Sequence, residues 1–183
     1  MVAKNESEAA HMNQTSLELK GDREIVITRT FNGPPRIVFD AWTRPELVRR
    51  WWAPKSRRVS LVGCDADVRV GGSYRYVAKL DAGGQFAFSG VYTEVTPYSR
   101  LVHTEIFEPT ASGATPDDVP LIVTVTFEER DGKTHVVSHS LCPSKEVRDM
   151  IIASGMEHGM RESMDQLDEL AATLAESEGR VAK

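Results

Sequence analysis

The residues with the most scope for chemistry are His103 and Glu105, which stand two apart in a run that predicts a β-strand. Side chains at positions i and i+2 of a strand share a face, so an imidazole and a carboxyl would lie together, as in general acid–base catalysis. The direction of that face is ambiguous, because Leu101 and Phe107 share its parity while the other parity is also largely apolar. A pair on the solvent face is the favoured interpretation, and a polar pair inside a cavity is the alternative.

No other set of side chains indicates a metal site, a nucleophile or a phosphate loop. His135 and His139 lie four residues apart on a predicted strand, about 13 Å, which is too far for one ion to bridge. His158 is expected on the solvent side of a helix, and the two cysteines, Cys64 and Cys142, have no evident activating partner. The glycine pairs are assigned to turns: Gly71–Gly72 and Gly83–Gly84. The sequence therefore predicts no metal, no cofactor and no catalytic residue.

Composition bounds the class of protein. The 183 residues, 40% hydrophobic and 27% charged with a net charge of −5, are typical of one globular domain. Two cysteines indicate no disulfide framework, and no apolar run approaches the about 20 residues of a membrane span, so a reduced cytoplasmic protein without membrane contact is expected. Four arginines flank Trp51 and Trp52, but in an acidic chain they favour a solvated loop over a nucleic-acid site: Arg49, Arg50, Arg57 and Arg58.

The elements that would position these side chains begin after a polar segment, residues 1–20, which is predicted to be a flexible tail. The β-branched run 24–31 predicts a strand that ends at Asn32-Gly33-Pro34-Pro35. Helical spacing then predicts two short helices between Pro34 and Trp52, with Thr43 as a cap and Pro45 at the first helical position of the second. We expect one domain over residues 21–178, with a short tail at 179–183.

An antiparallel meander follows, because short alternating runs are separated by turn residues. The predicted strands are 59–65, 73–80, 85–95, 100–108, 120–129 and 133–141. Asp131-Gly132 is the strongest hairpin signal among their connections.

A single helix of about thirty residues is predicted from Ser144 to about Glu176, which is long for a domain of this size. Its apolar stripe would lie on the sheet: Met156, Met160, Met164, Leu167, Leu170, Ala171 and Leu174. A second row, Gly155, Gly159 and Ser163, costs helix propensity. The favoured explanation is close approach of helix and sheet, and the alternative is room for a ligand.

The fold class that results is α+β: an antiparallel sheet with a long C-terminal helix lying on it, and two short helices after the first strand. Alternation sets Tyr74, Tyr76 and Ala78 against Arg75, Val77 and Lys79, and the first group is expected inside. The predicted cavity lining is Trp42, Trp51, Tyr74, Tyr76, Phe86, Phe88, Tyr92, His103, Glu105, Val123, Val125, Phe127, Met156, Gly159 and Met160. A dry, filled core is the competing interpretation.

These elements resemble the START-like superfamily, also called SRPBCC, and within it the activator of heat shock protein 90 ATPase homologue 1-like family. The resemblance lies in six stretches that occur in order between residues 23 and 175: Thr28-Arg29-Thr30-Phe31, Val38 to Glu46, Trp51-Trp52-Ala53-Pro54, Asp67 to Gly72, Gly90 to Val95 with Arg100-Leu101, and Ser154 to Met160. It implies a helix-grip fold, in which a curved antiparallel sheet wraps around the long C-terminal helix and encloses a cavity. It leaves the function open, since members share a shape and differ in role.

Three functions fit the sequence. The leading hypothesis is binding of a small hydrophobic molecule in an internal cavity. The alternatives are a cyclase- or hydrolase-like enzyme that uses His103 and Glu105 or a buried tyrosine, and an interaction module that assists a chaperone ATPase. The sequence also leaves a homodimer open.

Overall fold

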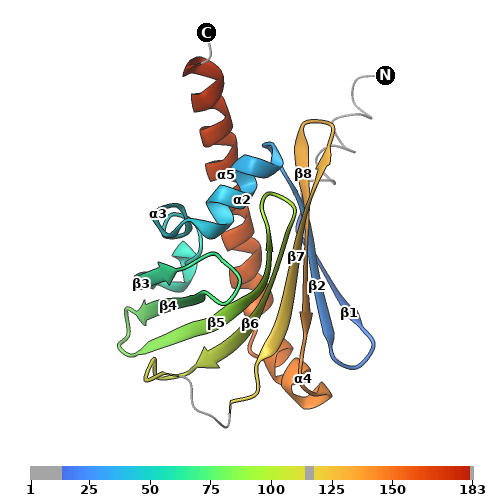
Figure 1. Ribbon diagram of the computed structural model, residues 1–183. Coiled ribbons are helices and arrows are strands. Elements are labelled where there is room, and N and C mark those ends of the chain that lie inside the picture. The colour runs from blue at the N-terminus through green and yellow to red at the C-terminus, as the bar shows by residue number, and fades with distance from the viewer. Residues whose placement is uncertain (1–13, 114–117, 182–183) are drawn as a thin grey trace.

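The computed structural model describes residues 14–113 and 118–181, and over these residues the chain forms one curved antiparallel sheet with helices on its concave side (Figure 1). The strands are β1 (Ser16–Lys20), β2 (Glu24–Phe31), β3 (Val59–Ala66), β4 (Ser73–Leu80), β5 (Gln85–Thr96), β6 (Arg100–Glu108), β7 (Leu121–Arg130) and β8 (Lys133–Leu141). Their order in the sheet is β1-β2-β8-β7-β6-β5-β4-β3. The α+β prediction is confirmed.

The N-terminal edge of the sheet differs from the prediction. Ser16–Lys20, which the sequence assigns to the flexible tail, form β1 and pair with β2, with Leu17 opposite Ile27. This strand is mostly exposed and polar, so it lacks the apolar alternation by which strands are recognised. Residues 1–13 of the predicted tail lie outside the described residues.

The two short helices after β2 are α2 (Pro35–Thr43) and α3 (Pro45–Val48), with Pro45 at the first position of α3 as predicted. α2 begins at Pro35, which the sequence analysis assigned to the turn after the strand. Thr43, however, is not the cap of α3. Its hydroxyl donates to the carbonyl of Phe39 within α2, and Arg44 occupies the N-cap position. A threonine near a helix end often bonds back to the preceding turn, which competes with capping.

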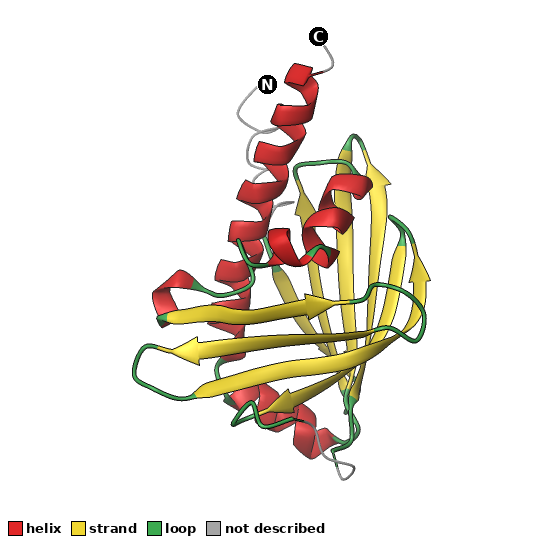
Figure 2. Cartoon of the chain, turned by 60° about the vertical axis from the view of Figure 1, so that its left-hand side comes forward, coloured by secondary structure: helices red, strands yellow, loops and turns green. Residues whose placement is uncertain are grey.

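The predicted single C-terminal helix is broken in two. α4 (Lys145–Ala153) begins at Ser144, whose hydroxyl accepts from the amide of Val147, and α5 (Met156–Val181) is the long helix. Between them Gly155 has φ +72°, a left-handed conformation that ends a helix and favours glycine. Figure 2 shows the short α4 set at an angle to α5 below the sheet. α5 also extends past the predicted domain end at 178.

The core lies between the concave face of the sheet, α2 and the middle of α5. Leu167 and Ala171 of α5 are fully buried, as are Val38 and Ala41 of α2. On β4, Tyr74, Tyr76 and Ala78 are buried as alternation predicts. The sheet and the two helices therefore enclose a common interior.

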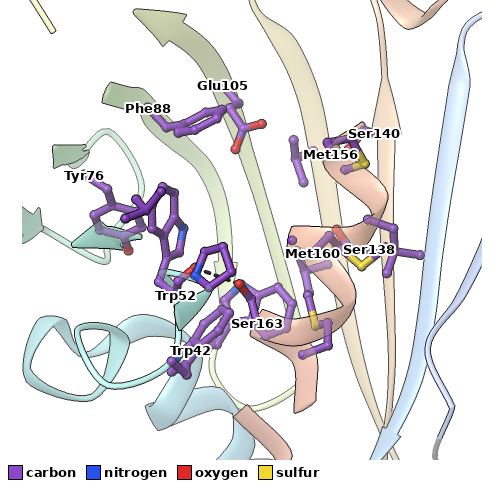
Figure 3. Close-up of a pocket in the computed structure, with 18 of the residues that line it drawn as sticks. Trp42, Trp52, Tyr76, Phe88, Glu105, Ser138, Ser140, Met156, Met160 and Ser163 are labelled. Carbon is purple, nitrogen blue, oxygen red and sulfur yellow. Dashed lines mark hydrogen bonds between the residues drawn. The ribbon is translucent and has the colours of Figure 1, made fainter. Parts of the chain in front are cut away.

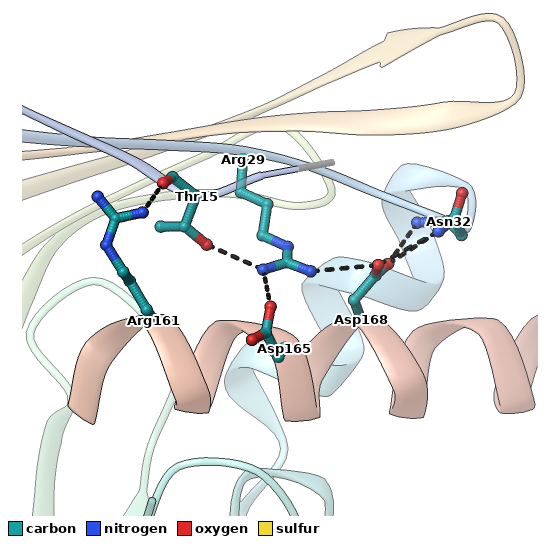
Figure 4. A network of polar contacts seen from close by, with 6 residues as sticks. All are labelled: Thr15, Arg29, Asn32, Arg161, Asp165 and Asp168. Atoms are coloured by element: carbon teal, nitrogen blue, oxygen red, sulfur yellow. Dashed lines mark hydrogen bonds and ion pairs between the residues drawn. The ribbon is translucent and has the colours of Figure 1, made fainter. Parts of the chain in front are cut away.

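A polar clamp, formed by Arg29, Asp165 and Asp168, joins α5 to β2 (Figure 4). The guanidinium of Arg29 is 7% exposed; it pairs with Asp165 and, over 3.3 Å, with Asp168. Asp168 also accepts from the backbone amide of Asn32 over 2.8 Å, and Arg29 donates to the hydroxyl of Thr15 over 2.9 Å. These bonds fix the position of α5 against the strands.

Within the described ranges, none of the helices combines the length and the apolar character that crossing a bilayer requires.

Candidate functional site

A cavity of about 580 Å³ lies between the concave sheet face, the first turns of α5 and the segment 51–59 (Figure 3). Such a volume falls within the range of about 300–1,000 Å³ usual for small-molecule sites. From the predicted set, the structure places these residues in the lining: Trp42, Trp51, Tyr74, Tyr76, Phe86, Phe88, Tyr92, His103, Glu105, Val123, Val125, Met156, Gly159 and Met160. Their role in binding stays a prediction.

Phe127 is the exception in the predicted lining. Its ring packs edge-on against Phe39, at 5.3 Å between centroids, and against Trp42, at 5.9 Å. Phe127 faces the same side of β7 as Val123 and Val125, but α2 covers this end of the strand and the space is filled. Alternation identifies the face of a residue, and it does not show what lies above it.

The lining also includes residues that the sequence analysis missed. Trp52 is the largest, and its ring lies between those of Tyr76 and Phe88, at 6.0 and 5.6 Å. Ser138 and Ser140 of β8 also face the cavity. The register of the β7–β8 hairpin could have identified them, because directly opposite residues on paired strands share a face of the sheet. Ser140 lies opposite Val123, and Ser138 lies opposite Val125.

The row of small residues Gly155, Gly159 and Ser163, at the start of α5 and just before it, makes room for the segment 51–59, not for the sheet. A Cβ on Gly159 would lie 3.3 Å from Cγ of Pro54. The hydroxyl of Ser163 donates to the carbonyl of Trp52 over 2.8 Å, and the carbonyl of Gly155 accepts from Arg57 over 2.8 Å. The small side chains therefore let this segment lie against α5 and close one wall of the cavity.

One end of the cavity is polar, which corrects the favoured interpretation of His103 and Glu105 as a solvent-face pair. Both line the cavity, and the Glu105 carboxyl points into it (Figure 3). The hydroxyl of Tyr74 donates to the carbonyl of Thr104 over 3.1 Å and lies 3.5 Å from Oε2 of Glu105. Both alternating sets of side chains on β6 are largely apolar, so the sequence alone did not determine which set faces the cavity.

Burial controls the ionisation of this polar end. It raises the pKa of Glu105 to about 7, against a smaller lowering by the Tyr74 hydroxyl. It lowers the pKa of His103, whose Nδ1 lies 3.1 Å from the carbonyl of Thr104. Burial also raises the pKa of the Tyr74 phenol. Near neutral pH this end therefore holds a neutral imidazole, a neutral phenol and a carboxyl near its midpoint.

The other reactive side chains do not form a site. Cys64 and Cys142 are free and buried, and burial raises the pKa of the Cys64 thiol to about 11, which disfavours a nucleophilic thiolate. His135 contacts the Thr30 hydroxyl, and His139 pairs with Glu24. Over residues 14–113 and 118–181, no cluster of side chains is suited to hold a metal ion.

Comparisons with known proteins agree with this fold. A model of the family described as activator of Hsp90 ATPase homolog 1-like protein matches residues 32–172. A solved structure from Staphylococcus epidermidis is 30% identical with a TM-score of 0.73, covering 86% of this chain and 94% of that one. A structure from Rhodobacter sphaeroides shares the fold, with 22% identity, a TM-score of 0.77 and coverage of 88% and 99%. A search of curated proteins finds no match.

Proposed function

We propose that this chain, which belongs to the activator of Hsp90 ATPase homolog 1-like family, binds a small and mostly apolar molecule in the cavity between the sheet and α5. The observation that carries the proposal is a pocket of about 580 Å³, partly open to solvent, between the concave sheet face and α5. Small-molecule sites are usually concave pockets of about 300–1,000 Å³ with mostly apolar walls, and this pocket has both properties.

The chemistry of the walls supports an apolar occupant. Trp42, Trp52 and Phe88 offer flat ring surfaces, and Met156 and Met160 offer side chains that adapt to irregular shapes. Burying apolar ligand surface against such walls contributes about 25 cal/mol per Å² before the costs of association. A ligand with a ring system would gain most from this lining.

Titration with the neutral fluorophore N-phenylnaphthylamine tests the proposal. The wild type should bind one molecule saturably. The Ser138→Phe variant, which fills the cavity from β8, should bind at least about tenfold more weakly. Ile122→Phe is the matched control, because Ile122 on neighbouring β7 is 47% exposed and should leave binding unchanged. Absence of saturable binding in the wild type would contradict the proposal.

Proton transfer on the bound molecule is a second candidate, favoured by one observation. The Glu105 carboxyl faces the cavity with a pKa of about 7, close to the value that suits a general acid or base at neutral pH. Exchange of deuterium into the carbon next to the carbonyl of tetralone, followed by NMR, tests it. Catalysed exchange by the wild type but not by Glu105→Gln would support this function, and equal exchange by both would exclude Glu105 as the base.

A further inference from the structure

The Glu105 carboxyl stands in the cavity without a cation. Within the described ranges, the Tyr74 hydroxyl is the one group at hydrogen-bonding distance from it, and that hydroxyl makes its shorter bond to the Thr104 carbonyl. Arg57 is the cation of the cavity lining, and it donates to the Gly155 carbonyl. When Glu105 is ionised, its charge therefore lacks a countercharge in its surroundings.

The other titratable groups near Glu105 cannot supply that charge. Tyr74 on β4 and Tyr92 on β5 are neutral phenols, and burial lowers the pKa of His103 on β6. Cys142, which follows β8, is a buried neutral thiol. The lining from the α4–α5 junction and α5 carries no ionisable side chain: Ser154, Gly155, Met156, Gly159, Met160, Ser163 and Met164.

Aromatic rings stand close to this carboxyl. The Tyr74 hydroxyl lies 3.5 Å from Oε2 of Glu105, and the Tyr74 ring lies 5.1 Å from the His103 ring and 5.6 Å from the Tyr92 ring, centroid to centroid. Phe88 lines the same cavity. The π-faces of tyrosine and phenylalanine attract an ammonium group, by about 2 kcal/mol or more where water is excluded. A carboxylate together with aromatic faces is a suitable environment for a protonated amine.

Building on the proposed binding function, we infer that the cavity selects a primary or secondary amine with an apolar, ring-sized body, whose ammonium group pairs with Glu105. The ammonium supplies the countercharge that the protein lacks, and its N–H groups donate to the carboxylate oxygens. An alcohol of the same shape supplies one neutral hydrogen bond and leaves the charge unpaired. A ligand carboxylate would place two like charges together when Glu105 is ionised and should bind more weakly than the amine.

Calorimetric titration with naphthylethylamine and with the equally shaped naphthylethanol tests the inference. At about pH 8 the wild type should bind the amine at least about tenfold more tightly than the alcohol. Lowering the pH to about 6 protonates Glu105 and should weaken amine binding about tenfold, because its pKa is about 7, while the alcohol is unaffected. Both conditions leave the amine itself protonated.

Two variants assign the preference to the carboxyl. Glu105→Gln should lose the preference for the amine while it still binds N-phenylnaphthylamine, which also shows that the variant is folded. Glu105→Asp keeps a carboxyl and should keep part of the preference. Equal affinity of the wild type for amine and alcohol, or an unchanged preference in Glu105→Gln, would overturn the inference and leave cavity binding intact. If neither compound nor the fluorophore binds, the proposed function itself fails.

Discussion

Gly90 of β5 lies so close to β6 that a Cβ added to it would stand 1.8 Å from the carbonyl oxygen of Thr104. The same atom would stand 2.7 Å from Cε1 of Tyr74. The absent side chain lets the Tyr74 ring lie across β5 and reach the Thr104 carbonyl. The polar end of the cavity therefore depends on Gly90, because any side chain at this position would collide with the Thr104 carbonyl and the Tyr74 ring.

Gly90→Ala should lower the free energy of unfolding by about 2–4 kcal/mol, because backbone atoms of β6 cannot move away without breaking the sheet. Chemical denaturation measures this. Gly179→Ala is the control: Gly179 lies in α5 with no neighbour near its added Cβ, so the change should be neutral or slightly stabilising. Similar effects of the two substitutions would show that β5 and β6 are not packed as described.

The break between α4 and α5 predicts the sign of the stability change that a substitution at Gly155 causes. Gly155→Ala should destabilise the protein by about 1 kcal/mol, because Gly155 has φ +72° and alanine is strained there. In an unbroken helix, the same substitution would stabilise the protein by about 1 kcal/mol through helix propensity. Thermal or denaturant unfolding of the variant therefore distinguishes a broken helix from a continuous one.

The clamp between β2 and α5 should be sensitive to one carboxylate and tolerant of the other. Asp168→Asn should cost about 2 kcal/mol, since the buried Arg29 loses its partly buried carboxylate and keeps the exposed one of Asp165. Asp165→Asn should cost below about 1 kcal/mol, because the Asp165 side chain is 66% exposed and its charge is screened by water. Equal costs for the two variants would contradict the buried geometry of Asp168.

Glu105 should make the protein less stable as the pH rises. A carboxylate in an ion pair has the opposite effect, because its pKa is lowered on folding. Burial raises its pKa from 4.5 to about 7 in the folded state, so the folded protein holds this proton more tightly than the unfolded chain does. The stabilisation is complete below the unfolded pKa and is lost as the pH rises to about 7. The loss is on the order of 3 kcal/mol.

The difference in unfolding free energy between Glu105→Gln and the wild type isolates this effect, because other titrating groups are common to both proteins. Relative to the wild type, the variant should gain stability between about pH 4 and pH 8 by that order of magnitude. A difference that stays flat with pH would show that Glu105 is solvated rather than enclosed.

Much of the fold can be predicted from short-range patterns in the sequence. The β-branched run at Glu24–Phe31 and the alternation on β4 are set by short-range patterns, and both the strand bounds and the inward face were predicted from them. Ser144 likewise has the residue type and position of a helix cap. The family resemblance then supplied the arrangement of the sheet around the helix.

The remaining features depend on contacts between distant segments. Apolar residues at helical spacing resume at Met156, so the sequence analysis predicted one helix, although the break lies at Gly155, which has φ +72°. Phe127 has the parity of a lining residue, yet α2 covers it. His103 and Glu105 lie on a strand with two apolar faces, and the curvature of the sheet decides which face encloses the cavity.

The most direct test of the binding claim uses NMR signals of methionine methyl groups during titration with N-phenylnaphthylamine. Met156, Met160 and Met164 line the cavity, whereas Met150 on α4 is 65% exposed and serves as an internal control. We predict saturable shifts of the three cavity signals with a common dissociation constant and an unchanged Met150 signal. Unchanged cavity signals, or a shift of Met150 alone, would contradict binding between the sheet and α5.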